Sequence, residues 1–171
     1  MAVHTKHDQH QMSVGTRGAY AAAGAVAATV WAAQQPLDKR AFRYAYDDVA
    51  YLGTLVTRSA PGWQVAGLAM HAMNGATFGL VYSELRRRTP GIDARSSALG
   101  LAMTEHVGLF PLAGVLDRYH PAVRSGAHPP VFGSWRAFAQ ATWRHALFGI
   151  LLGLGARAID RRSQGNNQRR K

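Results

Sequence analysis

Residues 63–83, WQVAGLAMHAMNGATFGLVYS, contain no Asp, Glu, Lys or Arg. Three other stretches are similar: 18–37 has no charged residue, 96–116 has only Glu105, and 137–156 has only Arg144. Each is close to the ~20 residues that cross the ~30 Å hydrocarbon layer of a bilayer as a helix, where helices satisfy their backbone polar groups internally. The sequence therefore predicts an all-α polytopic membrane protein, with four transmembrane helices in a bundle over about 18–37, 63–83, 96–116 and 137–157.

The composition agrees with this class. The 171 residues are enough for one domain, and 17% of them are charged, below the roughly 25% usual for soluble domains. The alternative is a soluble, basic, Ala-rich four-helix bundle, whose helices would carry charges every three or four residues on their outer faces. Those faces carry no charge here. The mean hydropathy of the whole chain is only −0.15, because the polar ends and loops lower it. The absence of cysteine excludes disulfides, thiolate metal sites and Cys nucleophiles.

The connections between the four stretches have distinct characters. We expect a polar tail over 1–17, an amphipathic helix over about 38–58 lying on the outer surface, and a disordered basic tail over 161–171. In the amphipathic stretch, Phe42, Ala45, Val49, Leu52 and Val56 recur at the three- and four-residue spacing of one helical face.

The distribution of Lys and Arg predicts the orientation. The N-terminal tail, the 84–95 loop and the C-terminal tail carry twelve of these residues, and the connections on the other side carry seven. Since basic residues are enriched on the cytoplasmic side, we expect a multi-pass protein of the inner (cytoplasmic) membrane with both termini cytoplasmic. The expected partners are the lipid bilayer and either further copies of the chain or the other subunits of a membrane complex. The basic residues of the C-terminal tail are explained by its cytoplasmic position, and we expect no specific nucleic-acid partner.

One histidine lies near the middle of each of the last three predicted spans: His71, His106 and His145. Their positions fall close to the midpoints between the charged residues that flank each span. Gly75 and Gly79 follow His71 at intervals of four, as Gly149 and Gly153 follow His145, and this spacing keeps each His on the small-residue face where helices pack. These two histidines should therefore point into the bundle.

Three other polar residues lie at this depth. Glu105 and Arg144 each precede a histidine, and the simplest prediction is that they form an ion pair. Asn74, one turn from His71, is a further candidate for the same polar cluster. Pro111, five residues after His106, should kink the third span.

Three interpretations of this cluster stay open. His71, His106 and His145 are candidate ligands of a cofactor, either haem b through two axial histidines or a transition metal through three. This favours an electron-transfer or accessory subunit. Alternatively, the polar cluster only fixes helix packing in a non-catalytic structural or assembly subunit. A proton-linked transporter or channel is the third possibility. No HExxH, phosphate-binding loop or GxSxG motif is present, so the sequence points away from an enzyme without deciding the matter.

The third span also carries a resemblance to a known family. His106 is followed by Phe110, Pro111, Leu112 and Gly114, and Leu99 to Ala102 precede it. This run resembles the YagU-like family of small bacterial inner-membrane proteins of unknown function. His71, Phe78 and Tyr82 in the second span, with Glu84 near its end, have similar spacings, and the fourth span matches more loosely through His145 and the arginines that close the helix, Arg157, Arg161 and Arg162. The resemblance covers roughly residues 63–162. It implies several membrane helices and three intramembrane histidines, and it implies no activity.

Overall fold

The computed structural model describes residues 12–168, and the part of the chain that it describes is all-α, without β-strands. The helices are α1 (Val14–Phe42), α2 (Asp48–Val56), α3 (Gly62–Arg88), α4 (Ala94–Leu109), α5 (Leu112–Tyr119), α6 (Pro121–Arg124) and α7 (Trp135–Gln168). The all-α prediction is confirmed. Most of the predicted N-terminal tail, residues 1–11, and the last three residues lie outside the described part.

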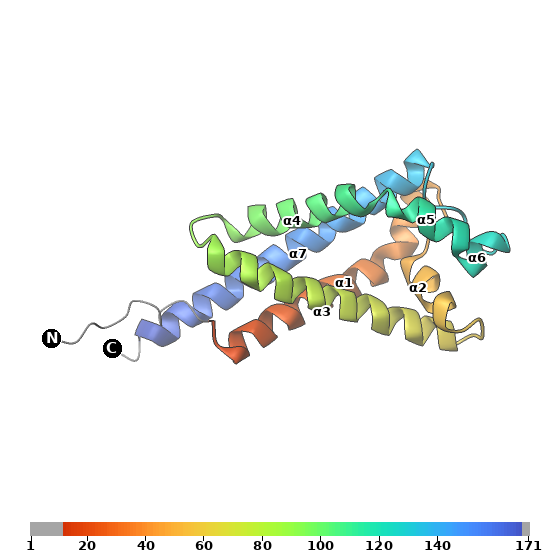
Figure 1. The fold of residues 1–171 in the computed structure, drawn as a ribbon. Helices are drawn as coiled ribbons and strands as arrows, with labels where there is room; N and C mark the ends of the chain where they lie inside the picture. Colours follow the sequence, from red (N-terminus) through yellow and green to blue (C-terminus); the bar gives the residue numbers. More distant parts are fainter. Residues whose placement is uncertain (1–11, 169–171) are drawn as a thin grey trace.

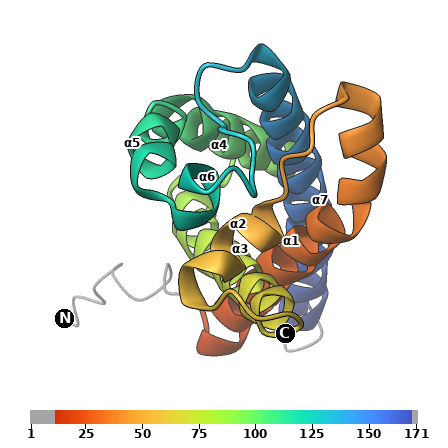
Figure 2. The same cartoon turned by 90° about the vertical axis from the view of Figure 1, so that its right-hand side faces the viewer.

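The long helices α1, α3, α4 and α7 run roughly along one axis (Figure 1). The start of α1, the turn between α3 and α4 and the end of α7 lie at one end, whereas α2, α5 and α6 gather at the other. α3 packs on α1, α1 on α7, and α7 on α4, but α3 and α4 contact each other little beyond their connecting turn. The end view in Figure 2 shows α2 and α6 over the bundle.

Short capping residues set several helix starts. Ser13 Oγ accepts a hydrogen bond from the Thr16 amide, and Asp47 Oδ1 accepts one from the Ala50 amide. Asp93 Oδ2 caps α4 by accepting from the amides of Arg95 and Ser96. Such caps satisfy amides that have no partner within the first turn of a helix.

The amphipathic helix predicted over 38–58 is wrong as one continuous element. α1 does not end at Pro36 but continues to Phe42, so residues 38–42 belong to it. Only Asp48–Val56 form the separate helix α2. Arg43 ends α1 in the left-handed conformation, with φ at 49°, and Asp47 then starts α2 as its cap. These local signals outweigh the three- and four-residue apolar spacing that continues across the break.

Two other predictions concern helix ends. The third stretch is broken at Pro111 as predicted: α4 ends at Leu109, α5 begins at Leu112, and the two are bent by 55°. The tail predicted to be disordered from residue 161 is instead helical as far as Gln168, as the last part of α7.

Glycines allow close backbone contact between the long helices. A Cβ atom on Gly24 would lie 2.0 Å from the carbonyl oxygen of Gly75, and one on Gly79 would lie 2.2 Å from that of Tyr20. On the other side of the bundle, Gly149 and Gly153 lie against the backbone of α4 in the same way. The small-residue faces predicted for α3 and α7 therefore lie at helix contacts.

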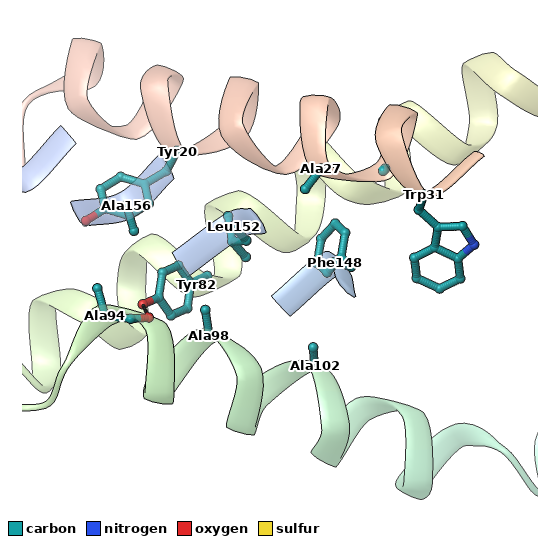
Figure 3. Packing of buried hydrophobic residues seen from close by; sticks show 11 residues of the cluster. Tyr20, Ala27, Trp31, Tyr82, Ala94, Ala98, Ala102, Phe148, Leu152 and Ala156 are labelled. Atoms are coloured by element: carbon teal, nitrogen blue, oxygen red, sulfur yellow. Dashed lines mark hydrogen bonds between the residues drawn. The ribbon is translucent and has the colours of Figure 1, made fainter. Parts of the chain in front are cut away.

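The buried apolar residues are mainly alanines and aromatic residues (Figure 3). Among the described residues, Val131 and Leu152 are the only buried aliphatic side chains larger than alanine. Large aliphatic side chains instead lie exposed along the long helices, including Val26, Val81 and Ile150. The largest fully buried side chain is an arginine, Arg144.

Among residues 12–168, no individual helix combines the length and the apolar composition needed to cross a membrane. The bent pair α4 and α5 meets both criteria when its two helices are taken together.

Candidate functional site

A cavity of about 340 Å³ lies in the half of the bundle that carries α2 and α5. Its walls come from α1, α2, α3, α4, α5 and α7, and they include all three predicted histidines. Asn74 of α3 and Leu109 and Leu116 of α4–α5 line the cavity and are exposed at the surface. The cavity therefore opens between α3 and α4–α5, where these two parts of the bundle separate.

His145 has a hydrogen-bonding pattern that fixes its tautomer. Its Nδ1 lies 2.8 Å from the carbonyl oxygen of Ala141, which can only accept, so Nδ1 carries a proton. Its Nε2 lies 3.2 Å from Glu105 Oε2. A favourable contact there requires one proton between the two groups, either on the imidazole or on the carboxyl. His145 and Glu105 thus form a polar pair on the cavity wall.

His106 is held by a different chain of bonds. The Thr142 hydroxyl donates to the carbonyl oxygen of Phe138, so its oxygen is left to accept from His106 Nε2 at 2.9 Å. The ring of His106 stacks on that of His145, with centroids 4.6 Å apart and planes 29° apart. His106 therefore uses Nε2 to bind Thr142 and one face to pack on the neighbouring imidazole.

Of the three histidines, only His71 has a buried ring nitrogen that lacks a hydrogen-bond partner. Its side chain lines the cavity, the residue is 7% exposed, and its Nε2 has no hydrogen-bond partner among the described residues. The Trp31 indole contacts the rings of both His71 and His145, at centroid distances of 5.0 and 4.7 Å. Because buried polar atoms are normally hydrogen-bonded, this nitrogen is available to a ligand.

The predicted ion pair between Glu105 and Arg144 is wrong. The fully buried Arg144 guanidinium donates to both oxygens of Asp38 at 2.7 Å and, from Nη1, to Asp48 Oδ2 at 2.6 Å. It also donates to the carbonyl oxygen of Tyr46. The end of α1 and the start of α2 together place two carboxylates beside Arg144, whereas Glu105 on α4 is closer to His145.

Neighbouring side chains complete this network. Trp31 Nε1 donates to Asp48 Oδ2 at 2.8 Å, and Gln140 Nε2 donates to Asp38 Oδ1 at 2.6 Å. Trp31 therefore connects the histidines to the Arg144 network. The sequence patterns did not point to Trp31, Asp38 or Asp48, although Asp38, directly after the uncharged stretch 18–37, was a usable signal for a partner of a buried arginine.

A second group of contacts fastens the outer wall of the cavity. Asp117 Oδ2 accepts from the amides of Val131 and Phe132 at 2.7 Å, and the Tyr51 hydroxyl donates to Asp117 Oδ1. His120 Nε2 contacts the carbonyl oxygen of Tyr51 at 2.8 Å. α2, α5 and the 125–134 connection are thereby held together.

Asn74 does not join the predicted polar cluster. It lies on the cavity wall at the opening, exposed, and makes no side-chain hydrogen bond within the described part of the chain. Glu105 also lies toward the opening, with 38% of its side chain exposed.

The arrangement does not fit the predicted metal site. Within residues 12–168, no group of three or more His, Asp or Glu side chains is placed to hold one metal ion. Binding through the Nε2 atoms of all three histidines would require the contacts to Thr142 and Glu105 to break. The stacking of His106 on His145 also differs from two axial ligands on opposite faces of a haem.

Comparisons with protein-family models, curated proteins and solved structures found no match to this chain. The resemblance to the YagU-like family stays a prediction, carried by the residues in the second, third and fourth stretches.

Proposed function

We propose that this chain is a multi-pass protein of the inner membrane that binds a small, largely apolar molecule. The ligand enters from the bilayer through the opening between α3 and α4–α5. The four passes are α1, α3, the bent pair α4–α5, and α7. The protein acts as a binding or transport protein rather than as an enzyme.

The observation that carries this proposal is the distribution of apolar side chains. Large aliphatic residues lie on the outside of the long helices, and alanine, aromatic and charged residues lie inside. In water this arrangement would forgo the free energy of burying large apolar side chains. In a bilayer it is favourable, because lipid solvates the outer side chains and small residues let the helices pack closely.

The same distribution explains why the individual helices have low mean hydropathy. Their inward faces are rich in Ala and Gly and include His71, His106 and Arg144. A polar residue in such a position is compatible with a membrane helix when it faces the bundle interior and has a partner.

The arrangement of helix ends supports the proposed orientation. The start of α1, the α3–α4 turn and the end of α7 share one end of the bundle, and the residues around them include Arg86, Arg87, Arg88, Arg157 and Arg161. The bias of basic residues toward this end favours a cytoplasmic position.

The cavity supports the binding role. Binding sites are concave and mostly apolar, with a few polar groups that orient the ligand. Here apolar walls surround His71 Nε2, the His145–Glu105 pair and Asp48. The exposed Leu109 and Leu116 at the opening offer a lipid-soluble molecule an apolar entrance.

Membrane extraction and labelling test the proposal. The protein should stay in the membrane pellet after alkaline carbonate treatment. Because the chain has no cysteine, Ser125→Cys and Gln164→Cys give single labelling sites at opposite ends of the bundle. A membrane-impermeant maleimide should label Ser125→Cys in intact spheroplasts and should label Gln164→Cys only after lysis. Release by carbonate as a monodisperse protein without detergent would contradict the proposal.

The same purified protein tests the cofactor interpretation. An absorption spectrum of the oxidised and reduced protein, with elemental analysis, should show no Soret band and no stoichiometric metal. A Soret band that is lost in His71→Ala or His145→Ala would instead establish haem ligation and overturn the proposed role of the cavity.

A further inference from the structure

We propose that the ligand of this cavity is a lipophilic organic cation, with a positive charge carried on an aromatic or alkyl body. This inference rests on the proposed function and specifies the class of molecule that the cavity binds. Three independent features of the wall carry it: its charge, its aromatic side chains and the free nitrogen of His71.

The charges beside the cavity do not balance. Asp38 and Asp48 share one guanidinium, that of Arg144, which leaves one negative charge in excess. Asp38 is enclosed, but Asp48 lines the cavity and 12% of its side chain is exposed. Glu105 lies 3.2 Å from His145 Nε2, and 38% of its side chain is exposed, so it adds no positive charge to the cavity. A cation in the cavity would be attracted to this excess negative charge, more strongly than in water because the surroundings are largely apolar.

The nearby groups do not supply that compensation. Behind the wall, Asp117 is a further buried carboxylate, and its partners are two amides and the Tyr51 hydroxyl rather than a basic side chain. Lys39 of α1 is paired with Asp47. His106 binds the Thr142 oxygen through Nε2. The remaining group that can gain a positive charge beside Asp48 is His71.

The cavity wall is also rich in aromatic rings, contributed by Trp31, Tyr46, Tyr51, Phe78, Phe110 and Phe148. Cations are attracted to the faces of aromatic rings, most strongly where both are removed from water. The protein already uses this interaction, since the Arg144 guanidinium carbon lies 5.2 Å from the centroid of the Tyr46 ring. Aromatic walls and an excess carboxylate together favour a cation over a neutral or anionic molecule of the same shape.

His71 gives the cavity a means of exchanging the ligand for a proton. Burial disfavours a proton on its unpartnered Nε2, but once the pH is low enough for that proton to bind, the imidazolium supplies a positive charge beside Asp48 and opposes a second cation in the cavity. Protons and the ligand should therefore compete. The charged and titratable groups that act on His71 are Asp48, Arg144 and His145, and Tyr46 and Glu105 line the same cavity.

Binding measurements on the full chain in lipid nanodiscs test the inference. The probes are methyltriphenylphosphonium, a cation, and triphenylphosphine oxide, a neutral molecule of similar shape. We expect saturable binding of the cation, at least about tenfold tighter than that of the neutral probe, and weaker cation binding as the pH falls below about 6.5. Equal or tighter binding of the neutral probe would overturn the inference while leaving the proposed function intact. Failure of both probes to bind would count against the cavity as a ligand site.

Two variants and a control locate the effect. Asp48→Asn leaves Arg144 paired with Asp38 and removes the excess charge, so cation binding should weaken about tenfold or more while binding of the neutral probe is unchanged. Glu105→Gln, away from the Arg144 network, should shift the pH dependence of cation binding. Glu84→Gln is the matched control, because Glu84 pairs with Arg87 and Arg88 near the α3–α4 turn and does not line the cavity. Unchanged cation binding in a folded Asp48→Asn variant would overturn the inference, and if that variant does not fold, equal binding of the cationic and neutral probes to the wild type would do so.

Discussion

At the scale of single residues, Arg144 holds the cavity end of the bundle together. It connects α7 to the end of α1 through Asp38, to the start of α2 through Asp48, and to the intervening link through the Tyr46 carbonyl. Replacing a buried ion network by apolar residues is often neutral, but removing one partner leaves an unpaired buried charge. The network should therefore be sensitive to single substitutions and tolerant of concerted ones.

Substitution of Arg144 tests this directly. Arg144→Met should destabilise the protein by roughly 3–5 kcal/mol, because it leaves two buried carboxylates without a counter-charge. The triple variant that adds Asp38→Asn and Asp48→Asn should recover much of that loss. Thermal denaturation of the three proteins in the same detergent measures the difference. A single variant as stable as the wild type would show that the network is dispensable.

Asp48, which begins α2 outside the four proposed spans, makes stability depend on pH. Burial raises the pKa of its carboxyl, but the Arg144 guanidinium, His71 and hydrogen bonds from Tyr46 and Trp31 together lower it more, so the pKa lies below the ordinary value of 3.8. A carboxyl with a lowered pKa stabilises the folded state above its unfolded pKa, and this contribution is lost as the pH falls through the folded value. The melting temperature should therefore drop below about pH 3.8.

The Asp48→Asn variant is the control for that experiment. Its melting temperature should be lower than that of the wild type near neutral pH, and the two should converge in acid. Parallel curves over the whole range would show that Asp48 is not the group responsible.

At the scale of helices, the contact between α1 and α3 depends on glycine. A Cβ atom on Gly75 would lie 2.5 Å from both the carbonyl oxygen of Gly24 and the Cβ of Ala28. A Cβ atom on Gly100 of α4 would meet no atom within 4 Å, so Gly100 is a matched control within a helix. The two glycines thus separate the effect of close packing from that of helix propensity.

Gly75→Ala should force α1 and α3 apart and destabilise the protein by about 1–3 kcal/mol. Gly100→Ala should be neutral or stabilising by up to about 1 kcal/mol, because alanine favours helix. Melting temperatures in detergent check both values. Equal effects at the two positions would contradict the close contact between α1 and α3.

The sequence was informative about where helices and breaks occur. The four stretches with no more than one charged residue lie within α1, α3, α4–α5 and α7, and Pro111 produces the predicted bend. The spacing of glycines after His71 and His145 correctly indicated the packed faces. The break at Arg43 depends on a single left-handed residue and a following cap, which the apolar spacing of residues 42–56 concealed.

The partners of the polar residues were harder to predict. Depth along a helix can be estimated from flanking charges, but the direction of a side chain around the helix axis depends on which helices are neighbours. Because α7 lies between α1 and α4, Arg144 reaches Asp38 and Asp48 on one side, while the adjacent His145 reaches Glu105 on the other. The cavity arises from the separation of α3 from α4–α5, for which the sequence carried no local signal.

At the scale of the whole molecule, large aliphatic side chains lie on the outside, and alanine, aromatic and charged residues surround the cavity on the inside. This is the distribution that the proposed membrane location requires. The membrane location, the route of entry and the cation ligand all depend on lipid covering the outer faces of α3 and α7.

The most direct test is the solvent accessibility of those faces. Spin labels attached to Val81→Cys on α3 and Ile150→Cys on α7, two exposed apolar positions, should collide more with oxygen, which concentrates in lipid, than with a water-soluble nickel chelate. A label on Ser125→Cys, in the connection after α6, should show the opposite preference. If Val81→Cys and Ile150→Cys collided mainly with the nickel chelate in reconstituted protein, the bundle would not lie in the bilayer, and the central claim would be wrong.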